Sequence, residues 1–563
     1  MNKRTKKLLI WVLLPVFVCL AVFAVELGFN WKRLFLPAEQ QGETALALSD
    51  FVVTQSEPAP DAEPSEEEYA EEAEDGSALT FPSEGTQATL AWSGYIHQLK
   101  LTGRLAGGTA YDVIPYTVTC TLGDGSTVTR TSTYSFILAS DSISIDAEVT
   151  GITLSVSAGG LSLVDATVVN TAGLNGARML FTALCALCAY LLAALHTLIG
   201  KKAEYGFLIV ALAAGLFLSV ALPRDTAESY DDQIHFNKVW NLSMGRDVTV
   251  TPSAEALSSL TWAMKVGESF VLTMDTEDEQ RQLDALLDAG DDQAAAAKSV
   301  TRQWVLTDVG YATQAAGLSL ARALGLPFHV QVIVSRMFNM LTYVLLGFLA
   351  IRSLKRYKLV FATVALLPTP LFMSSCFSYD PTCLGLCLLG TALTVGAILE
   401  RDTLLSWQRA LAIPVCFILA CCVKAVYVPL MLMVLLLPRS KFASNGMRVW
   451  YKVGMMLLMV ATLASILVAI GKDVGTIEDA RGEGADAMGQ VSFMLSNPIT
   501  YAGYFFSTLL GNFRLYLVDT CRVTWAYMGG LTGTQGTISL IAIVLACFLD
   551  YDPTLGQRFN WKQ

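Results

Sequence analysis

The sequence predicts a mostly α-helical, polytopic membrane protein with about ten transmembrane helices and an inserted extracytoplasmic β-sandwich-like domain. Three observations predict this fold class. Of the 563 residues, 53% are hydrophobic and 15% are charged, and the mean hydropathy is +0.49, whereas soluble domains average about 25% charged residues. Apolar runs long enough to cross a bilayer recur along the chain. Residues 79–172 instead alternate short β-branched runs with Gly and Asp turns.

The N-terminus carries a basic flank followed by an apolar run, Leu8 to Val25. Positive flanks face the cytoplasm, so residues 1–30 are predicted to be a transmembrane anchor with a cytoplasmic N-terminus. A cleaved signal peptide is the alternative, because Val22-Phe23-Ala24 resembles a small-residue cleavage site. In either case the following segment lies outside the cytoplasm.

Residues 31–78 are predicted to be an acidic, disordered linker. Ten carboxylates and no basic residue lie between Glu57 and Asp75, and such a composition cannot bury a core. This tract accounts for nearly all of the net charge of −11. Because the charge is local and no basic stripe is present, nucleic acid is excluded as a partner.

The stretch 79–172 has the pattern of a β-sandwich. Tyr116 to Leu122 alternates apolar and polar side chains before the turn Gly123-Asp124-Gly125. Alternation of period two with regular turn signals is typical of this fold. Carbohydrate binding and a spacer role both fit such a domain.

The polytopic part, 176–563, is divided by its basic loops. Loops at 201–202, 352–358, 401–409 and 439–452 all face the cytoplasm if each apolar run spans once. The predicted spans after the anchor are 177–199, 205–222, 329–351, 359–376, 381–399, 408–422, 425–438, 453–471 and 536–550.

Two regions, 408–438 and 498–530, and the long loop 223–328 have structures that the list of spans does not describe. We expect two short helices turning near Lys424 within 408–438, since one long helix would place the next basic loop outside. Residues 498–530 form either an external interfacial helix or a further hairpin. The external loop 223–328 is predicted to contain amphipathic helices at 254–266 and 277–289 and to build a site or a lid.

The segment after the span 205–222 holds the strongest chemical signal. Asp231 and His235 are four residues apart and share a face of a helix, with Asp232 beside them. Carboxylates next to an imidazole suit general base catalysis or a divalent cation such as Mg or Mn. Helix capping at a membrane interface is the alternative.

Three further charges, Arg336, Asp380 and Lys424, lie in apolar surroundings near the outer ends of predicted spans. Charges in spans are costly and indicate function. Together with the carboxylates they suit an anionic lipid phosphate; a purely structural Arg336–Asp380 pair is the alternative. The twelve cysteines form no zinc motif, so no metal ligands are assigned, and no nucleotide-binding motif is present.

The segment Asp231-Asp232-Gln233-Ile234-His235-Phe236 resembles the D-E-x-x-H-F signature of a bacterial polytopic membrane family, domain-of-unknown-function family 2142, with Asp232 in place of the usual Glu. Similar segments follow in the same order: Tyr311 to Leu326 (Y-x-x-Q-A-x-G-L-x-L-A-R-A-L-G-L), Ser335-Arg336-Met337-Phe338-Asn339, Leu366-Leu367-Pro368, Ser378-Tyr379-Asp380 and Lys424-x-x-Tyr427-x-Pro429. The resemblance covers roughly 176–550. It also implies further spans and a Q-G-R-Y-F-like segment, which these 563 residues do not contain.

That family is thought to be related to C-type glycosyltransferases, which use polyprenyl-phosphate sugars and an acidic residue in the first large external loop. The resemblance therefore implies Asp231 or Asp232 as the base or metal contact and His235 as an orienting group. It makes Arg336 and Lys424 candidates for the donor phosphate. The other residues of these motifs predicted to bind substrate are Tyr311, Tyr379, Asp380 and Tyr427.

The predicted function is transfer of a sugar from a polyprenyl-phosphate donor to a cell-envelope glycan acceptor, at the outer face of a bacterial plasma membrane. Membrane lipid is an expected partner. A lipid or polysaccharide transporter is one alternative, and a non-catalytic envelope scaffold is the other.

Overall fold

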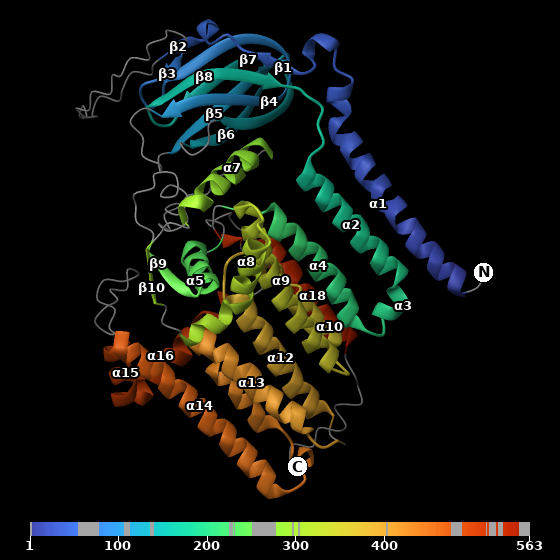
Figure 1. Cartoon of the computed structure of the whole chain (residues 1–563), viewed down its shortest axis with the longest axis vertical. Coiled ribbons are helices and arrows are strands. Elements are labelled where there is room, and N and C mark those ends of the chain that lie inside the picture. The colour runs from blue at the N-terminus through green and yellow to red at the C-terminus, as the bar shows by residue number, and fades with distance from the viewer. Residues whose placement is uncertain are drawn as a thin grey trace.

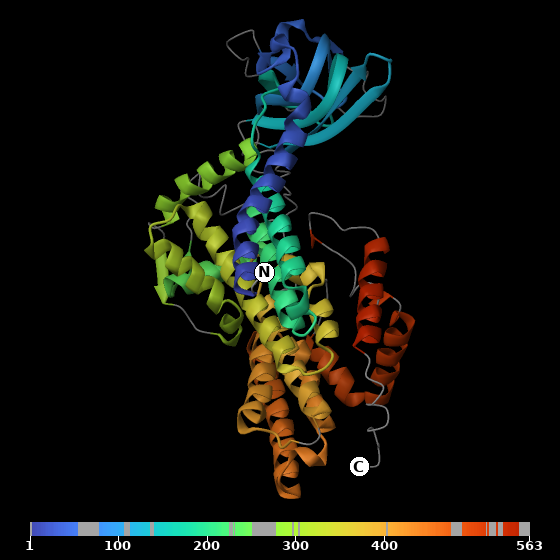
Figure 2. The ribbon, with the colours of Figure 1, turned by 90° about the vertical axis from the view of Figure 1, so that its right-hand side faces the viewer.

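The computed structural model describes residues 3–54, 78–105, 113–135, 140–224, 229, 231–249, 277–294, 298–301, 305–400, 403–473, 487–513, 515–516, 525–526 and 533–550. A β-domain lies at one end of the molecule and a body of helices at the other (Figure 1). Helix α1 (Lys3–Leu34) and helix α2 (Gly176–Ala194) lie side by side and connect the two parts, as the view turned by 90° also shows (Figure 2).

The β-domain is one eight-stranded antiparallel sheet with the strand order β1-β8-β4-β7-β5-β6, in which β2 also pairs with β4 and β3 with β8. The strands are β1 (Glu43–Ala45), β2 (Val52–Thr54), β3 (Leu79–Phe81), β4 (Gln87–Leu105), β5 (Val113–Leu122), β6 (Thr127–Ser135), β7 (Ser140–Val156) and β8 (Leu161–Val169).

Two long strands give this sheet its two-layered shape. The second half of β4, Gln98–Leu105, pairs with β8, whereas the second half of β7 pairs with β5. Irregularities between Ala91 and Gly94 and between Ile96 and Gln98 interrupt the β4–β7 register, and such bulges bend strands. Buried residues of β5 and β8 then meet in one core. The predicted sandwich is therefore built from one continuous sheet.

The linker predicted at 31–78 begins later than expected. Helix α1 continues to Leu34, and β1 and β2 already belong to the sheet. The cause is local apolar content, because Leu46 and Phe51 are 6% and 7% exposed and pack into the β-domain core. The acidic tract itself lies outside the described residues.

The remaining elements form the helical body. They are α3 (His196–Ile199), α4 (Ala203–Ala221), α5 (Asp232–Met244), β9 (Arg246–Thr249), α7 (Glu277–Ala294), β10 (Lys298–Thr301), the 3₁₀ helix η3 (Leu306–Gly310), α8 (Ala312–Ala323), α9 (Phe328–Ser353), α10 (Lys358–Ala365), α11 (Pro368–Ser374), α12 (Asp380–Leu399), α13 (Trp407–Val423), the 3₁₀ helix η4 (Ala425–Leu436), α14 (Asn445–Asp473), α15 (Ala487–Ser496), α16 (Pro498–Gly511) and α18 (Gly533–Leu549).

Six helices among the described residues are long and apolar enough to cross a membrane. They lie in α1, α2, α4, α9, α12 and α14. Three shorter apolar helices, α13, η4 and α18, add to them. The chain is thus a multi-helix membrane protein, and the count of about ten spans stays a prediction.

The structure differs from the predicted spans at 359–376. Two short helices, α10 and α11, occupy this stretch and are separated at Leu366 and Leu367. Pro368 is the physical reason, because a proline disfavours helical backbone in the residue before it and starts a helix well. The break near Lys424 is confirmed, since α13 ends at Val423 and η4 starts at Ala425.

In the C-terminal region, α16 covers Pro498–Gly511, and the choice between an interfacial helix and a hairpin for 498–530 stays a prediction. Helix α18 occupies most of the predicted span at 536–550. Asp550 after α18 accepts hydrogen bonds from the backbone N–H groups of Leu359 and Val360, at 2.6 and 3.0 Å. A carboxylate at the start of α10 satisfies orphan donors there.

Glycines allow the central helices to approach closely. A Cβ on Gly347 of α9 would lie 2.7 Å from the ring of Phe207 on α4, and one on Gly385 of α12 would lie 2.8 Å from Leu346. Small residues at such contacts are typical of helix packing in membranes. Helix α9 is therefore packed between α4 and α12 and provides the rigid centre of the body.

Helix α7 confirms the predicted helix at 277–289, while the one at 254–266 lies outside the described residues. One face of α7 meets the β-domain: Lys100 Nζ lies 2.7 Å from Asp278, and Ser142 N–H donates to Glu279 over 2.7 Å. Its other face buries Leu283 and Leu287 among residues of the helical body. Helix α7 thus joins the two parts of the protein.

Candidate functional site

The candidate site lies where α5, α8, the start of α12 and the joint between α13 and η4 converge, below α7 (Figure 1). Each of these elements contributes a residue that the sequence had singled out. The short segment Cys376–Asp380, between α11 and α12, contacts all of them.

Asp231 starts the site. It precedes the first turn of α5 in a left-handed conformation, with φ of 59°, and its carbonyl accepts a hydrogen bond from His235 N–H at 3.0 Å. Asp is among the few residues that tolerate this conformation. The left-handed turn directs the side chains of Asp231 and Asp232 to different surroundings: Asp231 is half-buried and Asp232 is wholly buried.

Asp232 and Arg336 form a buried charge pair. Both side chains are 0% exposed, and Arg336 Nη2 lies 3.9 Å from Asp232 Oδ2. Asp232 Oδ1 also accepts a hydrogen bond from Phe377 N–H at 2.8 Å. Arg336 Nη1 donates to the Pro223 carbonyl at 2.6 Å. The pair therefore fixes three chain segments to one another.

Two tyrosine side chains, Tyr311 and Tyr379, surround His235 on the next turn of α5. The hydroxyl of Tyr311 lies 2.7 Å from His235 Nδ1, and the Tyr379 ring meets the imidazole edge-on at 5.0 Å. Burial raises the pKa of Tyr311 above its usual range, so the hydroxyl keeps its proton. Burial lowers the pKa of His235 to about 4. The imidazole is thus neutral at pH 7, and one of its two nitrogens carries the proton.

Lys424 and Asp380 form the accessible charge pair. The distance from Lys424 Nζ to Asp380 Oδ1 is 3.0 Å, with side chains 40% and 24% exposed. The same ammonium lies 5.4 Å from the centre of the Tyr379 ring, a cation–π distance. Tyr427, one turn after Lys424, packs against the apolar clusters between α12, α13 and η4.

A buried polar network holds the segment 376–380 in place. The Ser378 carbonyl accepts hydrogen bonds from Gln314 Nε2 at 2.6 Å and Asn339 Nδ2 at 3.2 Å, and Ser335 Oγ donates to the Gln314 carbonyl at 2.9 Å. Gln314, Ser335 and Asn339 are 0% exposed. No role for these three residues was predicted from the sequence. The signal was present: Gln331, Ser335 and Asn339 recur every four residues on one face of an apolar helix.

The structure divides the predicted site in two. His235, Tyr311, Tyr379, Asp380 and Lys424 lie together, and the Asp231 carboxylate acts electrostatically on His235 and both tyrosines. Asp232 and Arg336 form a separate, wholly buried pair. The predicted alternative of an Arg336–Asp380 pair is wrong, because each forms its ion pair with a different partner.

The donor set for a divalent cation is sparse. Among the described residues, no group of three or more His, Cys, Asp or Glu side chains is placed to hold a metal ion. Asp232 is held by Phe377 and Arg336, and His235 Nδ1 by Tyr311. The carboxylates of Asp231 and Asp380 alone would be too few protein ligands for a dedicated site.

Fold and site together define a polytopic membrane protein with a cluster of charged and aromatic residues at one end of its helices. A family model described as "Predicted membrane protein (DUF2142)" matches residues 215–550, and the chain belongs to this family. No curated protein matches it. Among solved structures, a rhamnosidase from Klebsiella oxytoca with rhamnose bound is similar at 12% identity, covering 70% of this chain and 80% of that chain with a TM-score of 0.14. A likeness at that score carries no argument about fold or function.

Proposed function

We propose that the protein is a membrane glycosyltransferase of the C-type architecture. It transfers a sugar from a polyprenyl-phosphate donor to a cell-envelope glycopolymer at the outer face of a bacterial plasma membrane. The observation that carries this proposal is the accessible Lys424–Asp380 pair beside Asp231, His235 and Tyr379. A reachable cation next to a carboxylate and a neutral imidazole matches an anionic donor and a hydroxyl acceptor.

Lys424 is the proposed contact for the donor phosphate. An ammonium has three donors, and within the described part of the chain Lys424 donates one hydrogen bond, to Asp380, which leaves capacity for a phosphate oxygen. Arg336 takes a different role from the one the resemblance implies. As a wholly buried partner of Asp232, it positions the start of α5 and the segment 376–380 and does not touch substrate.

Asp231 is the proposed general base. It takes the proton of an acceptor hydroxyl, whose oxygen forms a bond to the anomeric carbon of the donor sugar. The bond from that carbon to the phosphate oxygen breaks, and polyprenyl phosphate leaves with the electron pair. A single displacement of this kind inverts the anomeric configuration. The other ring nitrogen of His235, Nε2, orients the acceptor or the donor sugar.

The two ends of the helical body support the proposed placement in the membrane. Basic residues of the loops at 201–202 and 352–358 lie at one end of the spans, and Lys358 pairs there with Glu204 at 2.8 Å. The β-domain, α5 and α7 lie towards the other end (Figure 1). Since positive loops face the cytoplasm, the proposal places the N-terminus inside and the β-domain and loop 223–328 outside.

The test is transfer of a radiolabelled sugar from a polyprenyl-phosphate donor by membranes containing the full chain. Asp231→Asn is expected to lower the rate by about 10² to 10⁴, the range for loss of a general base. The matched control is Asp124→Asn, an exposed turn residue of the β-domain, with activity unchanged. Equal activity of Asp231→Asn and wild type would overturn the assignment of the base, and absence of transfer in wild type with every donor tried would favour a transporter or scaffold.

A further inference from the structure

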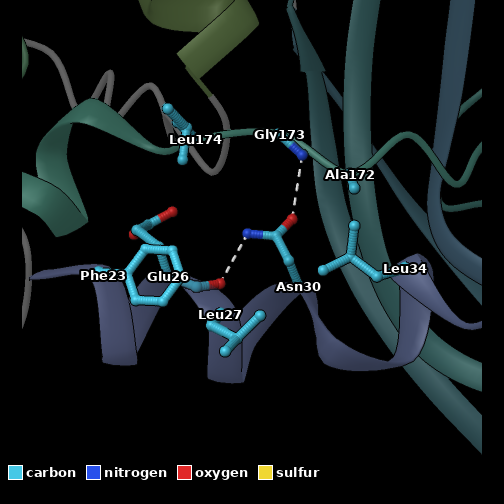
Figure 3. Close-up of a pocket in the computed structure, with 8 residues that line it drawn as sticks. All are labelled: Phe23, Glu26, Leu27, Asn30, Leu34, Ala172, Gly173 and Leu174. Atoms are coloured by element: carbon cyan, nitrogen blue, oxygen red, sulfur yellow. Dashed lines mark hydrogen bonds between the residues drawn. The ribbon is translucent and has the colours of Figure 1, made fainter.

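A separate cavity of about 240 Å³ lies near the β-domain, away from the candidate functional site. It is formed between the last turns of α1 and the chain that enters α2. Its walls are apolar side chains, chiefly Phe23, Leu27, Leu34 and Leu174 (Figure 3). None of these residues belongs to the candidate functional site. We call it the α1–α2 groove.

The polar groups at the base of the groove are already used within the protein. The Glu26 carboxylate binds the Arg178 guanidinium through two contacts, at 2.6 and 2.8 Å. The Asn30 side chain accepts from Gly173 N–H at 3.0 Å and donates to the Glu26 carbonyl at 2.8 Å (Figure 3). The groove therefore offers an apolar surface, and the polar groups at its base already have hydrogen-bond partners within the protein.

The surroundings indicate what covers this surface. Both α1 and α2 are candidate spans with only 6% of their apolar windows buried inside the protein. Phe23 and Leu174 are 66% and 70% exposed, so the groove continues a face that the bilayer covers. Exposed aromatic residues, Trp31 and Phe35, flank Lys32 at the same end, as is typical of the interface with lipid headgroups.

We propose that the α1–α2 groove binds one acyl chain of a membrane phospholipid, in the leaflet nearest the β-domain. The phosphate of that lipid lies at the level of Lys32, which stands on α1 between the groove residues Asn30 and Leu34, where opposite charge favours it. The bound lipid fills the gap between α1, α2 and the base of the β-domain. It is distinct from the polyprenyl donor proposed for the site at Lys424.

Two glycines allow a matched test. A Cβ on Gly173, which lines the groove, would have no atom within 4 Å, so a larger side chain there enters open space. A Cβ on Gly28 of α1 also has no atom within 4 Å, but Gly28 does not line the groove. Gly173→Leu is therefore expected to fill the groove, whereas Gly28→Leu adds the same side chain outside it.

The experiment uses the full chain in nanodiscs of phosphatidylcholine and phosphatidylglycerol that contain a phospholipid with a photoreactive diazirine on its acyl chain. Crosslinked residues are mapped by mass spectrometry. Wild type is expected to be labelled at 23–34 and 172–174 more strongly than at the lipid-facing Phe181. Gly173→Leu is expected to lower this labelling about tenfold, a loss of about 1.4 kcal/mol in affinity, with Gly28→Leu unchanged.

Two results would overturn the proposal. One is labelling at the groove that equals that at Phe181 and does not change in Gly173→Leu. The other is loss of phospholipid labelling when unlabelled polyprenyl phosphate is added, which would assign the groove to the donor chain. If Gly173→Leu does not fold, Phe23→Ala removes an exposed wall of the groove and is expected to lower labelling in the same way.

Discussion

Arg336 and Lys424 carry the same charge and the sequence singled out both for the same phosphate, yet their surroundings are opposite. Arg336 is 0% exposed beside an equally buried Asp232, whereas the Lys424 side chain is 40% exposed. Breaking a buried pair by removing one partner costs about 3–5 kcal/mol. An exposed pair contributes at most about 1 kcal/mol. Replacing Arg336 and replacing Lys424 should therefore have different effects on the protein.

Arg336→Met is expected to lower the thermal stability of the detergent-solubilised protein sharply, because Asp232 is left as an uncompensated buried charge. Lys424→Met should leave the unfolding temperature near that of wild type and abolish transfer from the phosphate donor. Thermal unfolding and transfer are measured on both variants. A stable Arg336→Met variant without transfer activity would contradict the positioning role and indicate that Arg336 contacts the substrate.

His235 makes the folded state sensitive to acid. Burial lowers its pKa from 6.5 to about 4, so between these values the unfolded chain binds the extra proton and the folded chain does not. The contribution of the neutral His235 to the free energy of unfolding is therefore fully present above pH 6.5. It is lost as the pH falls towards 4, by an amount on the order of 3 kcal/mol. Unfolding of wild type and His235→Gln is compared at pH 7.5 and 5. A pH dependence that is the same in both would contradict this role.

Residue types in the site could be predicted, but not their pairing. The sequence identified Asp231, Asp232, His235, Arg336, Asp380 and Lys424 from charge in apolar surroundings. It predicted that Arg336 contacts a donor phosphate, with an Arg336–Asp380 pair as the alternative, because both residues were expected at similar depth. Depth does not give the direction in which a side chain leaves its helix, and the left-handed backbone of Asp231 separates two adjacent carboxylates. Such tertiary information is absent from hydropathy and charge alone.

At the level of elements, the length of the apolar runs predicted most helices. It did not predict the helix boundary that a proline sets within one such run. Averaged hydropathy describes 359–376 as one span, but Pro368 divides it into α10 and α11. At 408–438, a break near Lys424 was expected for reasons of charge, and α13 and η4 meet there. The strands at 43–54 were missed because three-residue strands depend on the sheet they join and have little pattern of their own.

Close packing between α8 and α9 depends on Gly317. A Cβ there would lie 2.7 Å from the ring of Phe338, so Gly317→Ala forces the two helices that carry Gln314 and Ser335 apart. Overpacking of this kind costs about 1–3 kcal/mol. Gly454→Ala on α14, where nothing lies within 4 Å, is the matched control and should be neutral or slightly stabilising. Equal unfolding temperatures for the two variants would show that α8 and α9 can move apart freely.

For the whole molecule, the unforeseen feature is that α7 joins the β-domain to the site. The sequence predicted an amphipathic helix at 277–289 but no partner for its acidic face. In the structure that face binds β4 and β7 through Asp278, Glu279 and Gln282. The opposite side carries Asp284 and Asp288, which pair with Arg224 and His329. The sequence pattern alone cannot show whether such a polar face meets water or a second domain.

This arrangement predicts that the amide of Ser142 reports on the contact between the two parts. Its N–H lies 2.7 Å from Glu279 and 2.9 Å from the carboxylate of Asp141, so it is protected by α7 as well as by its own strand. The double variant Glu279→Ala, Gln282→Ala is expected to speed hydrogen exchange at 140–142 by about tenfold or more, while the β-domain core around Val118 and Ile152 stays protected.

Arg281→Ala provides the control, because Arg281 lies on the same helix with a side chain that is 71% exposed. Its exchange pattern should match that of wild type. If the double variant also leaves exchange at 140–142 unchanged, α7 does not hold the β-domain, and the connections through α1 and α2 alone fix its position. If exchange rises and transfer falls together, the β-domain acts on the site through α7.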